Sequence, residues 1–195
     1  MSKLPKVLVP VVAASLLAAC AAPVSQQAVA SHTDEARSIA ARVPANLLAV
    51  LTAELQRSGS AGAIEVCRDK APEMARNASA QTGWDVRRAS LRNRNPKGVP
   101  DAWERAALER FDASVAAGAS PATLETWEVV SEGGQRWYRY AKALPTQPMC
   151  VQCHGTAGEL GTGVPEKLRT LYPNDRATGY SPGQVRGGLF LKKPI

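Results

Sequence analysis

Residues 126–154 read TWEVVSEGGQRWYRYAKALPTQPMCVQCH. The first part holds two segments rich in Trp, Tyr and Val, 126–131 and 135–144, on either side of Gly133-Gly134. Such segments around a Gly-Gly pair are typical of an antiparallel β-hairpin. The stretch ends in Cys150-Val151-Gln152-Cys153-His154. It therefore predicts a strand that leads, after a short connection, into a Cys-x-x-Cys-His motif.

Cys-x-x-Cys-His is the attachment signature of a c-type haem. In that chemistry the two thiols add to the two vinyl groups of one porphyrin, and the imidazole that follows binds the iron. The motif predicts a single covalent haem c, anchored by Cys150 and Cys153, with His154 as the proximal axial ligand.

Other interpretations of the Cys-x-x-Cys-His motif are less well supported by the sequence. A structural zinc site needs four ligands, and outside the motif the chain offers only Cys20, Cys67 and His32. A thioredoxin-like dithiol expects a helix that starts at the motif within a βαβ unit. Here Pro145 and Pro148 precede the motif and several glycines follow it, so we expect the motif to lie in a loop. A disulfide between its two cysteines remains an alternative.

The N-terminus is typical of an export signal. Lys3 and Lys6 precede an apolar run at 7–17, which is too short to span a membrane. Leu17-Ala18-Ala19-Cys20 then resembles the bacterial lipobox, in which the Cys becomes the lipidated first residue of the mature protein. An ordinary cleaved signal peptide with an incidental Cys20 is the alternative.

These features predict where the protein resides. We expect residues 1–19 to be a lipoprotein signal peptide and acyl chains on Cys20 to anchor the protein to a membrane. Haem c attachment outside the bacterial cytoplasm agrees with export, so the expected location is the cell envelope, facing the periplasm. Ala21, rather than Asp, after the Cys favours the outer membrane.

Length and charge limit the remaining possibilities. Residues 20–32, rich in Ala, Ser and Gln, predict a flexible tether, and 33–195 have the length of one domain. The chain has 24 Lys and Arg against 17 Asp and Glu, but two of the lysines fall in the signal peptide. The arginines are spread along the chain and no nucleic-acid module is recognisable, so we expect no nucleic-acid partner.

The body of the chain predicts an α+β fold. Cys67 and Met74 share the apolar face of one expected helix, while Pro44 should kink or divide another. Asp101 with Glu104 forms a capping box for a third. The expected elements are helices at 33–57, 61–81 and 101–117, strands at 126–131 and 135–144, a short helix at 165–171 and a strand at 184–191.

An ordered series of motifs resembles one family. They are Cys67-Arg68-Asp69-Lys70-Ala71-Pro72, Arg92-Asn93-Arg94-Asn95-Pro96, Pro100-Asp101-Ala102-Trp103-Glu104, the haem motif with Gly155, Tyr172-Pro173 to Gly179-Tyr180, and Arg186-Gly187-Gly188. The family is the exported bacterial haem c domain with a PAS-like fold, a domain of unknown function also found as the sensor part of signalling proteins.

The resemblance covers residues 61–191. It implies a sheet flanked by helices, a single haem, and an axial pair made of the motif His and an upstream Cys, which here are His154 and Cys67. One departure is Lys97-Gly98, where the family often has another Asn. It puts only the detail of that turn in question.

The residues themselves leave the sixth iron ligand open. His32 lies in or beside the tether and Met149 adjoins the covalent anchor, so neither is well placed to reach the opposite haem face. Met74 would make a high-potential electron carrier, whereas a Cys67 thiolate would stabilise ferric iron and lower the potential. A small buried core residue is the alternative for Cys67.

Further candidates concern the haem surroundings. Arg92 and Arg94 could bind the haem propionates, although arginines on the surface of a turn-rich segment are common. The large aromatic residues are expected to fill the core or line the haem cavity. They are Trp103, Trp127, Trp137 and Tyr138.

No acid–base constellation is recognisable, and we expect no enzyme. The sequence predicts a membrane-anchored haem protein for redox sensing or low-potential electron exchange, with an unidentified redox or signalling protein as partner. A His/Met electron carrier and a gas-binding or peroxidase-like haem protein are the alternatives.

Overall fold

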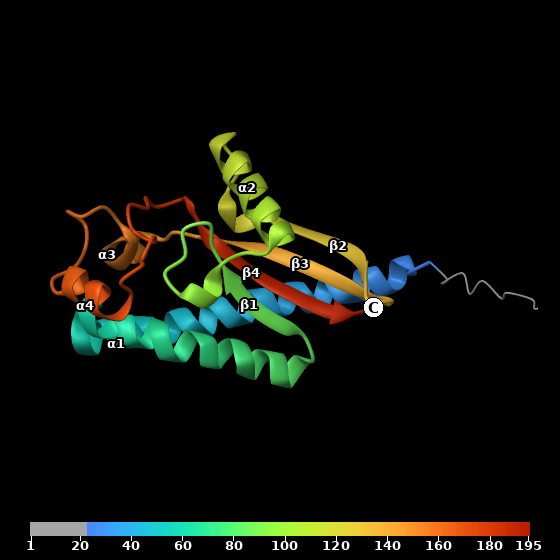
Figure 1. The fold of residues 1–195 in the computed structure, drawn as a ribbon, viewed down its shortest axis with the longest axis horizontal. Helices are drawn as coiled ribbons and strands as arrows, with labels where there is room; N and C mark the ends of the chain where they lie inside the picture. Colours follow the sequence, from blue (N-terminus) through green and yellow to red (C-terminus); the bar gives the residue numbers. More distant parts are fainter. Residues whose placement is uncertain (1–22) are drawn as a thin grey trace, which may run out of the picture.

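The structure, a computed structural model, describes residues 23–195 (Figure 1). The expected signal peptide and Cys20 lie outside the described residues. The fold is α+β, as expected, with one four-stranded antiparallel sheet in the order β1-β4-β3-β2. The elements are α1 (Gln26–Thr82), β1 (Asp85–Ala89), η1 (Pro96–Gly98), α2 (Ala102–Ala116), η2 (Pro121–Thr123), β2 (Glu125–Glu132), β3 (Gln135–Pro145), η3 (Pro148–Cys150), α3 (Val151–His154), α4 (Val164–Leu171) and β4 (Val185–Pro194), where η is a 3₁₀ turn.

The hairpin of β2 and β3 forms where the sequence predicts it. Gly133 and Gly134 have φ of 59° and 79°, the two positive values that a type I′ turn requires. Strand β4 pairs with β3 from Trp137↔Pro194 to Pro145↔Val185, and β1 closes the other edge by pairing with β4. Strand β1 was not expected, because Asp-Val-Arg-Arg-Ala carries too many charges for a strand pattern.

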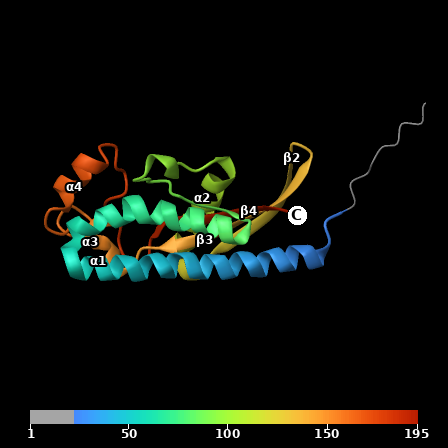
Figure 2. The ribbon, with the colours of Figure 1, turned by 90° about the horizontal axis from the view of Figure 1, so that it is seen from below.

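Helix α1 folds back on itself at Gly59, whose φ of 66° and ψ of −177° interrupt the helix. Figure 2 shows the two arms of this helical hairpin side by side along the body. The expected division at Pro44 is wrong, since Pro44 lies within the first arm. The glycine breaks the helix because its backbone conformation is open almost only to glycine.

The first arm also starts earlier than expected. Ser25 caps it and the helix begins at Gln26, so the predicted tether at 20–32 is helical in its second half. The Nε2 atom of His32 lies 3.0 Å from the carbonyl of Pro194, which ties this arm to the end of β4. By length and composition alone α1 could cross a membrane, with a mean hydropathy of 1.2 over 18 residues, but Ala36 and Ile39 of it are buried in the core.

The helices cover opposite faces of the sheet. Helix α1 packs on one face, where Trp84, Tyr138 and Leu191 are buried. Helix α2, which has the expected Asp101–Glu104 capping box, packs on the other. Among the large aromatics Tyr138 is fully buried, whereas Trp127, expected inside, is 47% exposed and stacks on the outer side of Tyr138.

The Cys-x-x-Cys-His motif lies beyond the end of β3, next to the turn of the α1 hairpin. The motif was expected in a loop, but Cys150 ends the 3₁₀ turn η3 and the next four residues form α3. Pro148 starts that turn, and Gly155 ends α3. The expected short helix is present as α4, which packs on the second arm of α1 through Ile64, Val164, Leu168 and Tyr172.

Candidate functional site

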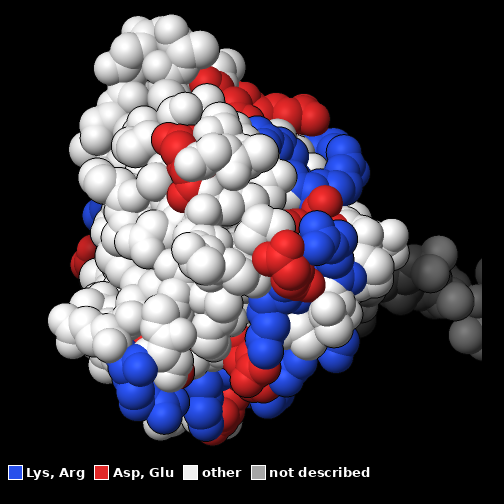
Figure 3. Space-filling view, turned by 90° about the vertical axis from the view of Figure 1, so that its left-hand side faces the viewer, with Lys and Arg blue, Asp and Glu red and all other residues white. Residues whose placement is uncertain are grey.

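The motif is docked on the turn of the α1 hairpin. Ser60 Oγ donates a 2.7 Å hydrogen bond to Gln152 Oε1, and the Cys153 Sγ lies 3.8 Å from the Ser60 carbonyl. Figure 3 shows this end of the molecule, where uncharged side chains cover much of the middle and Lys and Arg gather toward the margin. The break at Gly59 therefore places a helix turn against the motif.

His154 is oriented by a backbone carbonyl. Its Nδ1 lies 2.7 Å from the Ala177 oxygen and 3.2 Å from Arg186 Nε, but one nitrogen cannot donate to the carbonyl and accept from the guanidinium together. The shorter contact assigns the proton to Nδ1, which leaves the lone pair of Nε2 for a metal. Burial, and then the charges of Arg186 and Arg94, hold the pKa of His154 well below its usual range, so the ring is neutral at neutral pH.

The three described cysteines, Cys67, Cys150 and Cys153, are free thiols. Burial raises the pKa of Cys153 to about 11, and the backbone N–H of Gln147 lies 3.4 Å from the Cys150 sulfur. The alternative disulfide is thus not formed in this structure. Within residues 23–195 no three His, Cys, Asp or Glu side chains gather into a metal-ion cluster of the zinc type.

The second arm of α1 brings Cys67 to the motif. Burial raises the pKa of the Cys67 thiol, the charges of nearby arginines oppose that effect, and Cys67 interacts electrostatically with Cys150 and Cys153. His32, by contrast, lies at the Pro194 end of the sheet, as its rejection as a ligand requires. The structure thus places Cys67 within electrostatic range of the two motif cysteines.

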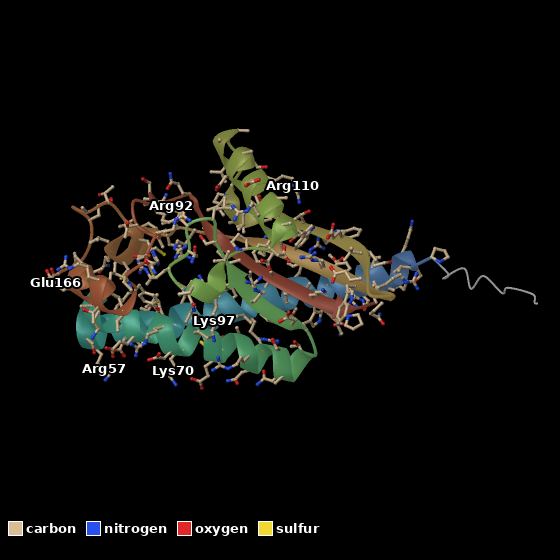
Figure 4. All side chains as sticks on the ribbon, viewed as in Figure 1. Arg57, Lys70, Arg92, Lys97, Arg110 and Glu166 are labelled. Atoms are coloured by element: carbon tan, nitrogen blue, oxygen red, sulfur yellow. The ribbon has the colours of Figure 1, made fainter. Side chains whose placement is uncertain are left out.

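The two expected propionate arginines differ in position. Arg94 is buried, donates a 2.6 Å hydrogen bond to the Cys153 carbonyl and forms a 3.0 Å ion pair with Asp175. Its Nε is buried and has no hydrogen-bond partner among residues 23–195. Arg92 instead stacks over the ring of Tyr180 at 4.0 Å, and within residues 23–195 no hydrogen bond or ion pair joins it to the motif (Figure 4). Arg94 belongs to the site, and Arg92 lies beside it.

A family model described as Tll0287-like matches residues 18–194. The chain belongs to the Tll0287-like family. The crystal structure of the cyanobacterial heme-protein Tll0287 matches with a TM-score of 0.61 and 24% identity, over 88% of this chain and 97% of that chain. At this identity the likeness shows a shared fold. No curated protein matches the sequence. The family expected from the ordered motifs is confirmed.

In this Tll0287-like chain, sequence reasoning missed two arginines at the site. Arg186 on β4 donates to Ser90 Oγ at 3.1 Å, and burial lowers the pKa of its guanidinium to about 10. Arg88 on β1 is exposed, and desolvation by nearby protein atoms lowers the pKa of its guanidinium. Arg186 belongs to the Arg186-Gly187-Gly188 motif, which could have pointed to it. Arg88 lies on β1, the strand that the sequence did not predict.

The donor set of this Tll0287-like site suits a haem c. It offers two free thiols at the right spacing, a neutral imidazole with Nε2 available, and a third sulfur on a separate element. The buried Nε of Arg94 is a hydrogen-bond donor with no acceptor among residues 23–195. A haem propionate is an acceptor that would fit it.

Proposed function

We propose that this protein is a c-type haem protein of the bacterial cell envelope. Cys150 and Cys153 would bind one haem through thioether bonds, and His154 and Cys67 would be its axial ligands. The observation that carries the proposal is the 2.7 Å hydrogen bond from His154 Nδ1 to Ala177, which presents Nε2 as a ligand beside two free thiols. The heme-protein Tll0287, which shares the fold, supports it.

The haem would supply a one-electron couple. If His154 and Cys67 both bound the iron, no position would remain for a substrate, and redox sensing or electron exchange would be favoured over catalysis. A thiolate ligand stabilises ferric iron, so the couple would have a low potential. The partner would be a redox or signalling protein, because a one-electron couple acts by exchanging electrons with another redox centre.

Covalent attachment is tested on protein matured in a host that attaches c-type haem. We expect haem staining to survive a denaturing gel, and to be lost in a variant with Cys150→Ser and Cys153→Ser together. Haem that leaves the chain on acid–acetone extraction would show that it is not covalently bound.

The axial pair is tested in the same protein by electron paramagnetic resonance (EPR). Cys67→Ser should keep the haem attached, change the ferric low-spin signal and raise the potential. A spectrum that responds to Met74→Ala but not to Cys67→Ser would replace this proposal with a His/Met carrier. A high-spin ferric haem would favour the gas-binding or peroxidase-like alternative.

Membrane attachment through Cys20 is a separate part of the proposal. Lipid-modified Cys20 would hold the domain at the periplasmic side of a membrane, in the outer membrane by the identity of Ala21. Intact-mass analysis of detergent-extracted protein should find a chain that starts at Cys20 and carries acyl groups. A soluble mature chain with another first residue would contradict this part and leave the haem proposal intact.

A further inference from the structure

A cavity of about 290 Å³ lies between α2 and the sheet. Leu108, Asp112 and Val115 of α2 form one wall, because their spacing makes them neighbours on one side of a helix. The other wall comes from the loops after β1 and before β4 and from the start of β4. The volume is at the small end of the range for ligand pockets, so it suits a small molecule.

The cavity has an apolar floor. Leu108 and Val185 line it and are buried, and both belong to the hydrophobic cluster under α2. None of the residues of the Cys-x-x-Cys-His motif lines this cavity. It is therefore a site separate from the sulfur and imidazole donors described above.

Two side chains of opposite charge, Arg92 and Asp112, also line the cavity. Within residues 23–195 neither forms an ion pair, with the other or with a third residue, and Asp112 accepts no hydrogen bond. The structure thus holds a cation and an anion at one apolar cavity, each without a charged partner.

Arg92 is fixed in place at the cavity. Its Nε donates a 3.3 Å hydrogen bond to the Arg176 carbonyl, and its guanidinium stacks over the ring of Tyr180 at 4.0 Å. Among the described residues its two terminal nitrogens have no acceptor. A guanidinium held in this way presents a pair of donors that matches the two oxygens of a carboxylate.

Asp112 offers the complementary charge. Its side chain is exposed, and desolvation by nearby protein atoms raises the pKa of its carboxyl, while the charge of Arg92 lowers it. A carboxylate that is partly removed from water gains more from an added cation than one in open solvent. An ammonium group is a cation of the right size to contact it.

We propose that this cavity binds a small zwitterion, an α-amino acid with an apolar side chain. Its carboxylate would bind Arg92, its ammonium would contact Asp112, and its side chain would lie on the floor formed by Leu108 and Val185.

Tyr180 connects this cavity to the haem ligand. Its ring carries Arg92 on one side and contacts the ring of His154 edge-on, with 6.4 Å between the ring centroids. Its backbone N–H also donates a 2.8 Å hydrogen bond to the His154 carbonyl. A bound zwitterion that pulls on Arg92 would therefore alter the packing of His154. This coupling rests on the proposed haem function, whereas the binding itself does not.

Binding is tested by isothermal titration calorimetry of the haem-loaded protein with L-leucine as the probe. N-acetyl-L-leucine lacks the ammonium charge and isopentylamine lacks the carboxylate, so each should bind at least tenfold more weakly than L-leucine. Absence of saturable binding by L-leucine, and also by glycine and L-phenylalanine, would refute the inference.

Arg92→Gln and Asp112→Asn should each weaken the binding of L-leucine at least tenfold. The matched controls on α2 are Arg110→Gln and Glu109→Gln, which remove the same charges from residues outside the cavity lining and should change the Kd less than twofold. Figure 4 shows Arg92 and Arg110 on different sides of α2. Equal affinities of Asp112→Asn and the wild type would show that no ammonium is recognised, and the inference would be wrong.

The ferric EPR signal tests the coupling to His154. Saturating L-leucine should change the g-values of the wild type and leave those of Asp112→Asn unchanged. If Arg92→Gln altered the spectrum before any amino acid was added, Arg92 would bind a haem propionate and the inference would be wrong. Absence of covalent haem in the wild type would refute the proposed function instead, while the calorimetric titration would still decide whether the cavity binds a zwitterion.

Discussion

The Arg94–Asp175 pair shows how single residues fix the site. Both side chains are almost fully buried, at 8% and 9% exposure, and Asp175 Oδ1 also accepts a 2.9 Å hydrogen bond from the N–H of Ala177. Ala177 in turn orients His154 through its carbonyl. The ion pair therefore holds the loop whose carbonyl selects the tautomer of His154.

Asp175→Asn should destabilise the fold, because it leaves the buried charge of Arg94 without a counter-ion. Loss of one partner of a buried pair typically costs about 3–5 kcal/mol, and we expect a decrease of that order in the unfolding free energy from urea denaturation. The control is Glu166→Gln in the exposed pair with Arg169, whose side chains are 66% and 71% exposed. It should change the stability far less, because solvent screens exposed ion pairs. Equal effects of the two variants would show that burial of Arg94 does not matter.

Glu35 gives a prediction of pH dependence at the other end of the sheet. Hydrogen bonds from Lys193 Nζ at 2.8 Å and from Trp84 Nε1 at 3.0 Å hold the pKa of Glu35 below its usual value. A carboxylate with a lowered folded-state pKa stabilises the fold above its unfolded pKa, and that stability is lost as the pH falls through the folded value. Glu35 is 46% exposed, so the contribution is below about 1 kcal/mol.

We expect Glu35→Gln to lower the unfolding free energy at pH 7 and to have little effect near pH 3. Denaturant titrations of both proteins at the two pH values measure the difference. If Glu35→Gln lowered the unfolding free energy more at pH 3 than at pH 7, the ionised carboxylate would not be the source of the stability.

At the scale of elements, the sequence predicted the hairpin and α2 but not the shape of α1. Gly133-Gly134 and the Asp101–Glu104 box are local signals whose geometry depends on adjacent residues only. Strand β1 could not be predicted, because its place depends on pairing with β4, which is distant in the chain. The expected helices at 33–57 and 61–81 leave a break at Gly59, where the structure has it, but they do not show that the two arms fold back on each other, and the division expected at Pro44 is absent because the helix continues through that proline.

Gly59→Ala should destabilise the hairpin of α1. No atom lies within 4 Å of an added Cβ, so the effect comes from the backbone conformation alone, about 1–3 kcal/mol. Because Ser60 follows and binds the motif, the same variant should loosen the docking of α3. Pro44→Ala is the control: it removes a proline from a helix interior and should not destabilise the protein. Thermal unfolding of both variants tests the assignment of the turn.

For the whole molecule, the sequence singled out candidate anchor and ligand residues but could not show how they come together. The spacing of Cys150, Cys153 and His154 is a local sequence signal that can be recognised without the fold. Cys67, in contrast, lies near the motif only because α1 folds back at Gly59. The arginines around the thiol come from β1, β4 and the loop after β1, three segments that no local pattern links. Long-range assembly is the part that sequence patterns leave undetermined.

The sheet and the motif segment have separate hydrophobic clusters, and this separation predicts how the protein responds to the loss of haem. The sheet is held by two clusters that do not include the motif, one under α1 and one under α2. The motif segment packs instead through a small third cluster of Ile64, Val164, Leu168 and Tyr172, with Cys153 at its border. A porphyrin would supply most of the apolar contact for residues 145–163.

We therefore expect the variant with Cys150→Ser and Cys153→Ser to keep its sheet and to lose order mainly at residues 145–163. Hydrogen exchange measured by mass spectrometry should show wild-type protection in β3 and β4 and faster exchange in the motif segment and the second arm of α1 next to it. Serine is close in size to cysteine, so the change reports the missing haem rather than a missing side chain. Protection that stays at the wild-type level through α3 would show that this segment is folded without the cofactor, and that haem binding does not order it.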